Sequence, residues 1–274
     1  MQQINGKKIA DQILKSISHK ESKTKLAVIL IGKNPASRLY VKIKEEKAKK
    51  IGINFEKHLL STDSKQKCII ELIQKLNTDK SVSAILVQLP LPKHLNTHKI
   101  IKTIHPNKDA DGIHPKHLKL LKQGKLPPIL PATTGAILEA IKSTKINLKN
   151  KSVAIIGKST IVGLPTYYYL KNKVKKINIY DSSTKNLKNK TSQADILIVA
   201  IGQPKYITEE YIKQNAIVID VGINKVGNKT IGDVDQNSVA KKASYLTPVP
   251  GGIGPLTVSI LLQNTIKLNS SPIL

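Results

Sequence analysis

The chain has 274 residues, an apolar fraction of 40% and a formal net charge of +27, so it is long enough for two domains or one large α/β unit. Its single cysteine, Cys68, excludes an intrachain disulfide and indicates a reducing compartment, so we expect a cytoplasmic protein. Apolar runs such as 84–89 are far too short to cross a membrane, and the first residues lack the apolar core of a signal peptide.

The positive charge raises the hypothesis of a nucleic-acid-binding module, which would bind random DNA with a steep salt dependence. Lysines are spread through nearly every segment, however, and Arg38 is the only arginine, although arginine is the usual reader of bases and phosphates. Aromatic residues make up only 3% of the chain. We therefore interpret the charge as a solvated surface that helps to attract an anionic substrate, and we expect neither a nucleic acid nor a membrane as partner.

The first half of the chain alternates helical patterns with short apolar runs. The runs ending at Gly32 and Pro90 are typical of parallel strands buried on both faces. This order predicts an α/β layer with right-handed crossovers. The expected helices cover residues 4–20, 37–50 and 65–76, and the expected strands cover 26–32, 54–60 and 84–90.

The helix expected over residues 37–50 carries the first candidate for chemistry. Leu39 and Ile43 have a helical apolar spacing, and Tyr40 and Lys44 lie four residues apart, so their side chains share one face. A lysine partly removed from water has a lowered pKa and can exchange protons near neutral pH. The alternative is a surface helix on which a lysine extends past a half-buried tyrosine.

The segment from residue 105 to 116 interrupts the alternation with prolines, histidines and two acids, Asp109 and Asp111. Its spacing matches no strong zinc or calcium pattern, so we expect a ligand-binding loop at the strand ends and no metal. The two aspartates could instead cap a helix or a turn. An extended linker over 127–131 and a helix over 134–144 follow.

The second half starts again with a strand over 152–157, a glycine turn and a helix through Leu170, which is the context of a nucleotide-binding fingerprint. The G-x-G-x-x-G pattern is not met, because Ser159 takes the place of the second glycine. The next strand, 176–180, ends at Asp181, 24 positions after Gly157, where an acid usually contacts the ribose of NAD. Further strands over 194–202 and 216–222 complete a small doubly wound domain.

The segment 247–257 combines three prolines with three glycines in a tight loop that lets a ligand approach the backbone. A domain hinge is the alternative interpretation. A closing apolar helix is expected over 258–268.

Six ordered motifs then point to one family. The set resembles the bifunctional methylenetetrahydrofolate dehydrogenase/methenyltetrahydrofolate cyclohydrolase family over nearly the whole chain. The motifs are Ser37…Tyr40-Val41…Lys44, Val87-Gln88-Leu89-Pro90-Leu91-Pro92, Lys108-Asp109-Ala110-Asp111-Gly112, Gly157…Ser159…Ile161-Val162-Gly163…Pro165, Gly232-Asp233-Val234 and the loop from Thr247 to Thr257.

The resemblance implies a two-domain α/β fold. Residues 1–133 would form an α/β catalytic domain, to which 250–274 return as the C-terminal helix, and 134–249 would form a Rossmann-type, doubly wound dinucleotide-binding domain. The folate would lie in the cleft, and the enzyme would be a homodimer. The implied reactions are oxidation of methylenetetrahydrofolate with NADP and hydrolysis of the product to 10-formyltetrahydrofolate, in one-carbon metabolism and purine biosynthesis.

The resemblance also implies the roles of individual residues. Lys44 would be the catalytic lysine, Tyr40 would stack on the aminobenzoyl ring, Gln88 would lie beside the lysine, and Asp111 would hold the pterin. The other implied substrate-binding residues are Val87, Leu89, Pro248, Gly251, Gly252 and Pro255. The implied cofactor-binding residues are Gly157, Lys158, Ser159, Ile161, Val162, Gly163, Pro165, Asp181, Ser182, Gly202, Gly222, Ile223 and Thr257.

Two departures from the family pattern affect the choice of cofactor. Lys158 stands where the family usually has arginine, and Asp181 stands where it usually has histidine. A lysine offers a point charge to the 2′-phosphate of NADP, whereas a carboxylate repels that phosphate and favours a ribose hydroxyl. The family resemblance makes NADP the expected cofactor, and Asp181 keeps NAD possible. Ala132, Thr134 and Ala136 also replace the family's Cys, Pro and Gly in a loop that carries no catalytic atom.

Two further alternatives stay open at this point. One is an NAD(P)-dependent dehydrogenase that acts on another small acid, which would show a different lysine or arginine context and no Pro-Val-Pro-Gly-Gly loop. The other is a family member that has lost one of its two activities, although Tyr40, Lys44, Gln88 and Asp111 are all present.

Overall fold

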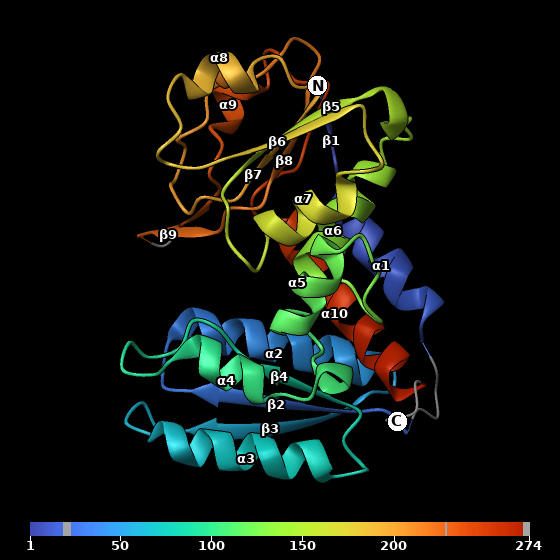
Figure 1. The fold of residues 1–274 in the computed structure, drawn as a ribbon, viewed down its shortest axis with the longest axis vertical. Coiled ribbons are helices and arrows are strands. Elements are labelled where there is room, and N and C mark those ends of the chain that lie inside the picture. The colour runs from blue at the N-terminus through green and yellow to red at the C-terminus, as the bar shows by residue number, and fades with distance from the viewer. Residues whose placement is uncertain (19–22, 228, 271–274) are drawn as a thin grey trace. The chain divides into compact units, whose positions relative to one another are not determined.

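A computed structural model describes residues 1–18, 23–227 and 229–270 (Figure 1). The chain divides into two compact units. The N-terminal unit comprises residues 13–120, 126–132 and the segment from 261 onward, and the central unit comprises 1–12, 121–125 and 133–260. The predicted fold class, two α/β domains with parallel sheets, is confirmed.

The sheet of the N-terminal unit has three parallel strands in the order β3-β2-β4. Its central strand β2 is buried along almost its whole length, as expected for a strand covered on both faces. Figure 1 shows α2 and α3 on opposite sides of this sheet. The elements are β2 (Lys25–Ile31), α2 (Pro35–Lys50), β3 (Asn54–Leu60), α3 (Gln66–Thr78), β4 (Ala84–Val87), α4 (Thr97–Thr103), η1 (Pro106–Lys108) and α5 (Pro115–Lys122).

One face of β2 packs against α3 and α4 through Ala27, Ile29 and Ile31, which belong to a cluster of fully buried aliphatic side chains. The connection after β2 passes through α2, which packs on β2 and β3, whereas the connection after β4 leads to α4 on the α3 side. The two chain paths thus diverge at the carboxyl ends of neighbouring strands. In open α/β sheets this divergence marks the place where ligands bind.

The central unit contains a six-stranded parallel sheet in the order β1-β11-β8-β7-β5-β6. Figure 1 shows α7 and α8 on opposite sides of it, as in a doubly wound domain. The elements are β1 (Gln2–Gln3), α6 (Ala132–Lys142), η2 (Leu148–Asn150), β5 (Ser152–Ile156), α7 (Gly163–Leu170), β6 (Lys176–Tyr180), α8 (Leu187–Thr191), β7 (Ile196–Val199), η3 (Glu209–Tyr211), β8 (Ile217–Asp220), β9 (Asn224–Val226), β10 (Lys229–Ile231), α9 (Gln236–Val239) and β11 (Tyr245–Leu246).

Helices α1 and α10 each have residues in both units, and both differ from the predicted bounds. Helix α1 covers Gly6–Ser16, whereas a helix over 4–20 was predicted; residues 19 and 20 lie outside the described part. Helix α10 covers Ile253–Asn269 and begins five residues earlier than predicted. Pro255 is compatible with this start, because a proline in the first helical turn removes an N–H that has no partner within the helix.

The short strands β1 and β11 were not predicted from the sequence. They pair in parallel, Gln2 with Tyr245 and Gln3 with Leu246, and this pairing places residues 1–12 in the central unit. The predicted domain boundaries assigned that segment to the catalytic domain. Two-residue strands carry too little alternation to be recognised in a sequence.

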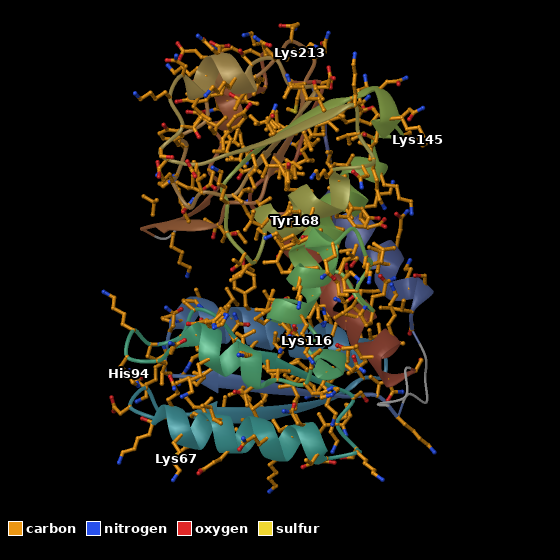
Figure 2. The ribbon with its side chains drawn as sticks, viewed as in Figure 1. Lys67, His94, Lys116, Lys145, Tyr168 and Lys213 are labelled. Carbon is orange, nitrogen blue, oxygen red and sulfur yellow. The ribbon has the colours of Figure 1, made fainter. Side chains whose placement is uncertain are left out.

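The lysines follow no single element. The lysines labelled in Figure 2 come from α3 (Lys67), α5 (Lys116) and the segments after α6 (Lys145) and η3 (Lys213). Among the described residues, no helix combines the length and the apolar character that a membrane span requires.

Candidate active site

Helix α2 positions the candidate lysine. Asn34 caps its first turn by accepting a hydrogen bond from the backbone N–H of Ser37 at 3.0 Å, and Pro35 occupies the first helical position. The buried face consists of Ser37, Val41, Lys44 and Ala48. Leu39, predicted to lie on the apolar face, is 51% exposed, so that part of the sequence interpretation was wrong.

Lys44 is only 7% exposed, and its Nζ donates a hydrogen bond to Oε1 of Gln88 at 2.8 Å. Gln88 directly follows β4, and its Nε2 donates to the backbone carbonyl of Leu89 at 2.6 Å, which turns the amide oxygen toward the lysine. Burial lowers the pKa of Lys44, and the negative charge of Asp111 partly opposes that shift. A buried lysine held by a neutral amide loses its proton more readily than an exposed one.

Tyr40 lies one turn before Lys44 on α2 and is partly buried, which raises the pKa of its hydroxyl. The tyrosine therefore stays neutral at physiological pH and offers an aromatic face next to the lysine. Val87 is the last residue of β4 and is buried, and Leu89 follows Gln88. The predicted residues Tyr40, Lys44, Val87, Gln88, Leu89 and Asp111 all belong to the N-terminal unit.

Asp111 is held by the backbone on both sides. The N–H of Ala110 donates to the carbonyl of Ile85 at 3.1 Å, and the N–H of Ala132 donates to the carbonyl of Asp111 at 2.9 Å. Burial raises the pKa of the Asp111 carboxyl, and the charge of Lys44 acts in the opposite direction. Asp111 thus supplies a carboxylate acceptor that is close enough to Lys44 for each group to affect the pKa of the other.

Asn264 on α10 was not singled out from the sequence. Its Nδ2 donates to the carbonyls of Ala110 and Leu130 at 3.1 and 3.0 Å, and its side chain is buried. It therefore joins the residue before Asp111 to the segment that leads into α6. An asparagine in an apolar helix was a possible signal, but the sequence does not indicate its partners.

Asp109 stabilises the conformation of the loop that follows it. Its Oδ2 accepts a hydrogen bond from the N–H of His114 at 2.6 Å, and burial raises its pKa to about 7. Nε2 of His114 lies 3.2 Å from the carbonyl of Lys102, and Nε2 of His117 lies 3.1 Å from that of Pro106. These contacts order the loop. Within the described residues, no three His, Cys, Asp or Glu side chains form a group that could hold a metal ion.

The glycine turn of the central unit connects β5 to α7. Gly157 has a φ of +116°, and a Cβ added to it would lie 2.1 Å from the carbonyl oxygen of Ala200. A Cβ on Gly163 would lie 1.7 Å from the carbonyl oxygen of Gly157. Gly157 therefore permits the turn, and Gly163 permits close packing of helix on strand, which are two of the roles that glycines have in dinucleotide-binding turns.

Ser159, which replaces the second glycine, stabilises the turn that leads into α7. Its Oγ accepts hydrogen bonds from the N–H groups of Val162 and Gly163 at 3.1 and 3.5 Å. Ile161 is partly buried in the same turn, and Pro165 is buried in the first turn of α7. A strand, a glycine turn and a helix start in this order fit the pyrophosphate of a dinucleotide.

Lys158 and Asp181 form an ion pair across the ends of β5 and β6, with Nζ 2.8 Å from Oδ2. Oδ1 of Asp181 also accepts hydrogen bonds from the backbone N–H and the hydroxyl of Ser183 at 3.1 and 2.6 Å. These contacts, first that of Lys158, hold the pKa of Asp181 well below its usual range. Ser182 is exposed in the adjoining turn.

The remaining predicted cofactor residues follow neighbouring strands of the same sheet. Gly202 lies beyond β7 with a φ of +67°, and Gly222 and Ile223 lie beyond β8, where Ile223 is 46% exposed. Thr257 is part of α10, and its hydroxyl donates to the carbonyl of Ile253 at 3.0 Å. These residues share the central unit with the glycine turn.

The proline- and glycine-rich loop also belongs to the central unit. Gly251 has a φ of +109°, and a Cβ on Gly252 would lie 2.6 Å from the carbonyl oxygen of Pro248. A Cβ on Gly6 would lie 1.9 Å from the carbonyl oxygen of Gly252, so the loop packs against the start of α1. Four of its six prolines and glycines, Pro248, Gly251, Gly252 and Pro255, are predicted to bind substrate.

Thr134, where the family has proline, meets a partner within the same unit. Its buried hydroxyl lies 3.2 Å from that of Thr166 on α7, which donates in turn to the carbonyl of Val162 at 2.7 Å. The hydroxyl pair thus connects α6 to the glycine turn. Helix α6 begins at Ala132, two residues earlier than predicted.

Comparisons with known proteins cover almost the whole chain. The catalytic-domain model of tetrahydrofolate dehydrogenase/cyclohydrolase matches residues 4–111, and the NAD(P)-binding-domain model of the same family matches 131–272. The bifunctional protein FolD of Nitratiruptor sp. is 44% identical over 275 residues, which cover 97% of each chain. That of Streptococcus uberis is 44% identical over 273 residues, which cover 96% of each.

Solved structures agree with these matches. The bifunctional FolD methylenetetrahydrofolate dehydrogenase/cyclohydrolase of Campylobacter jejuni is 39% identical, with a TM-score of 0.94 and 98% of both chains covered. The dehydrogenase-cyclohydrolase of Trypanosoma brucei, solved with NADP and an inhibitor, is 30% identical with a TM-score of 0.88, covering 96% of this chain and 94% of that one. The resemblance seen in the motifs is thus confirmed, and the chain belongs to the tetrahydrofolate dehydrogenase/cyclohydrolase family.

Proposed function

We propose that Lys44 is the proton-transferring residue of a bifunctional methylenetetrahydrofolate dehydrogenase and methenyltetrahydrofolate cyclohydrolase. The observation that carries this assignment is the burial of Lys44, with its Nζ 2.8 Å from Oε1 of Gln88. Burial lowers the pKa of the lysine, so its neutral form is more accessible than that of an exposed lysine. A group with this property suits general acid–base chemistry.

The hydrolysis can be written with Lys44 as the only side chain that carries a proton. Neutral Lys44 removes a proton from water while the water oxygen attacks the methenyl carbon of the folate. The protonated lysine then returns that proton to the departing ring nitrogen, and the carbon–nitrogen bond to that nitrogen breaks. The hydroxyl left by the water loses its own proton to solvent as the formyl C=O forms, and 10-formyltetrahydrofolate leaves. Gln88 holds the lysine in place in both protonation states, because its amide oxygen accepts a hydrogen bond from either form.

Tyr40 and Asp111 are proposed to orient the folate. The partly buried ring of Tyr40 offers a stacking surface for the aminobenzoyl group. The carboxylate of Asp111 can accept two hydrogen bonds from the amino and ring N–H groups of the pterin. Val87 and Leu89 are proposed to contact the folate beside Gln88, and Pro248, Gly251, Gly252 and Pro255 are proposed to contact it from the loop of the central unit.

The dehydrogenase step needs a nicotinamide dinucleotide, which when bound accepts a hydride from the one-carbon bridge of the folate. The glycine turn fits such a group, because Gly157 and Gly163 keep the backbone free of side chains where the helix begins. Lys158 is proposed to face the 2′-phosphate of NADP. The other predicted residues, Ser159, Ile161, Val162, Pro165, Asp181, Ser182, Gly202, Gly222, Ile223 and Thr257, are proposed to line the cofactor.

We further propose a cytoplasmic homodimer that supplies formyl groups for purine synthesis. The single cysteine, Cys68, is free and exposed, which suits a reducing compartment. The proposal that two subunits associate through the Rossmann-type domain is based on the family resemblance. The dimer is tested by measuring the mass of the protein in solution.

The first experiment supplies purified protein with methylenetetrahydrofolate and follows the reduction of NADP and NAD separately. Reduction is expected, and its absence in folded protein would contradict the dehydrogenase assignment. The second replaces the lysine: Lys44→Met should abolish methenyltetrahydrofolate hydrolysis. Lys42→Met is the matched control, because the Lys42 side chain is 73% exposed on the same helix. Full hydrolysis by Lys44→Met would remove the lysine from the mechanism.

A further inference from the structure

The Gly232-Asp233-Val234 motif belongs to the family resemblance, but the mechanism above gives it no role. Asp233 follows β10 and is fully buried. Its Oδ2 accepts hydrogen bonds from the backbone N–H groups of Ile201 and Gly202 at 2.7 and 3.0 Å. Its Oδ1 accepts one from Nδ2 of Asn224 at 2.8 Å. A single carboxylate therefore joins the segment after β7 to the segment after β8.

A second buried carboxylate, that of Asp220, extends this connection. Its Oδ1 accepts from the N–H groups of Gly222 and Asp233, both at 3.0 Å, and its Oδ2 accepts from that of Val234 at 3.1 Å. The backbone N–H of Asp220 donates to the hydroxyl of Thr247 at 2.7 Å. Thr247 directly precedes the loop that begins at Pro248. The two aspartates thus link the segments after β7, β8 and β10 to Thr247 within the central unit.

The neighbouring glycines are explained by these carboxylates. A Cβ on Gly222 would lie 2.2 Å from Cγ of Asp233, and a Cβ on Gly232 would lie 1.8 Å from Oδ2 of Asp220. Neither glycine needs a bound ligand to account for the lack of a side chain. The side chain of Asp233 thus explains why residue 222 is a glycine, although the sequence singled it out as a cofactor contact.

We infer that Asp233 is a positioning residue for the dinucleotide, because its carboxylate holds the backbone N–H of Gly202 and packs against Gly222, and both glycines are proposed cofactor contacts. This inference rests on the proposed function. Asp233 acts through backbone groups and is not expected to touch the cofactor. A carboxylate accepts from all three N–H donors, whereas an amide accepts through one oxygen only, so Asn at position 233 cannot keep all three bonds with Asn224 in its present orientation.

The test uses Asp233→Asn in the full-length protein and compares the two activities. The KM for NADP should rise about tenfold, with a smaller change in the kcat of the dehydrogenase. Hydrolysis of methenyltetrahydrofolate should stay within about twofold, because that reaction uses no dinucleotide and Lys44 and Gln88, proposed to carry its proton transfer, lie in the other unit. Asp235→Asn is the matched control: this aspartate caps α9 through the N–H groups of Asn237 and Ser238.

Two outcomes would overturn the inference. One is an unchanged KM for NADP, and the other is an equal loss of both activities with a lowered melting temperature, which would make Asp233 merely structural. If Asp233→Asn does not fold, Asn224→Ala decides, because it removes one donor only and should raise the KM for NADP by a smaller factor. Failure of the proposed function itself is distinguishable, since the unaltered protein would then reduce no NADP.

Discussion

The two lysines proposed to be functional lie in opposite surroundings. Lys44 is buried against the neutral amide of Gln88, and burial lowers its pKa. Lys158 is 43% exposed and forms an ion pair with Asp181 at 2.8 Å. A buried lysine without a direct carboxylate partner loses its proton more readily than an exposed one. One residue type thus suits proton transfer in one unit and anion recognition in the other.

The contrast shows that a substitution that keeps the positive charge has different expected effects at the two positions. At Lys44 the charge is the less useful state, because a protonated amine cannot accept a proton from water. At Lys158 the charge is the useful property. The Asp181 carboxylate competes for it, so a 2′-phosphate would have to displace or share an ion pair.

Replacing each lysine by arginine gives the largest expected difference between the two sites. Lys44→Arg should lower the kcat of hydrolysis by about 10²–10⁴-fold, because a guanidinium does not give up its proton in proteins. Lys158→Arg should leave hydrolysis unchanged and keep or improve the KM for NADP, because arginine binds phosphate with two parallel hydrogen bonds. Both activities are measured for each variant. Substantial hydrolysis by Lys44→Arg would contradict proton transfer by this residue.

Asp181→Ser tests the site of Lys158 and should change the preference for NADP over NAD by about tenfold or more. Removal of the carboxylate frees Lys158 and removes a charge that repels a 2′-phosphate, so kcat/KM for NADP should rise relative to that for NAD. Glu210→Ser is the matched control, because Glu210 forms an exposed ion pair with Lys188 in the same unit. An unchanged ratio of the two cofactors in Asp181→Ser would mean that the ion pair does not govern selectivity.

Sequence patterns predicted the parts of the molecule that depend on local order. The spacing of Tyr40 and Lys44 placed both on one helix, and the strand before Gly157 and the helix after it both exist. Even there the pattern misled at Leu39, since the apolar spacing of 39 and 43 suggested a buried face that lies instead at 37, 41, 44 and 48. A lysine on the buried face is against the usual distribution of residue types, so hydropathy alone points to the wrong side.

Contacts between distant segments could not be predicted in the same way. The departures at Lys158 and Asp181 were visible in the sequence, but their direct pairing depends on the ends of two neighbouring strands and on side-chain rotamers. Asn264 lies more than 130 residues from both carbonyls that it binds. The hydrogen bonds of Asp233 to the backbone at 201 and 202 likewise join segments that are distant in the sequence. Periodicity tells which face is buried, but it does not identify the polar groups found there.

The smallest expected effect concerns the pH dependence of hydrolysis and tests the influence of the Asp111 charge on the pKa of Lys44. The rate should rise with pH as Lys44 loses its proton. The negative charge of Asp111 raises the pKa of Lys44, so Asp111→Asn should lower that pKa and move the rising limb of kcat to lower pH. The measurement is kcat against pH at saturating methenyltetrahydrofolate, because loss of the pterin contact should raise KM. Asp63→Asn, in an exposed turn of the same unit, is the control. A shift to higher pH would mean that the limb reports a group other than Lys44, and the buried lysine would then lose its assignment as the base.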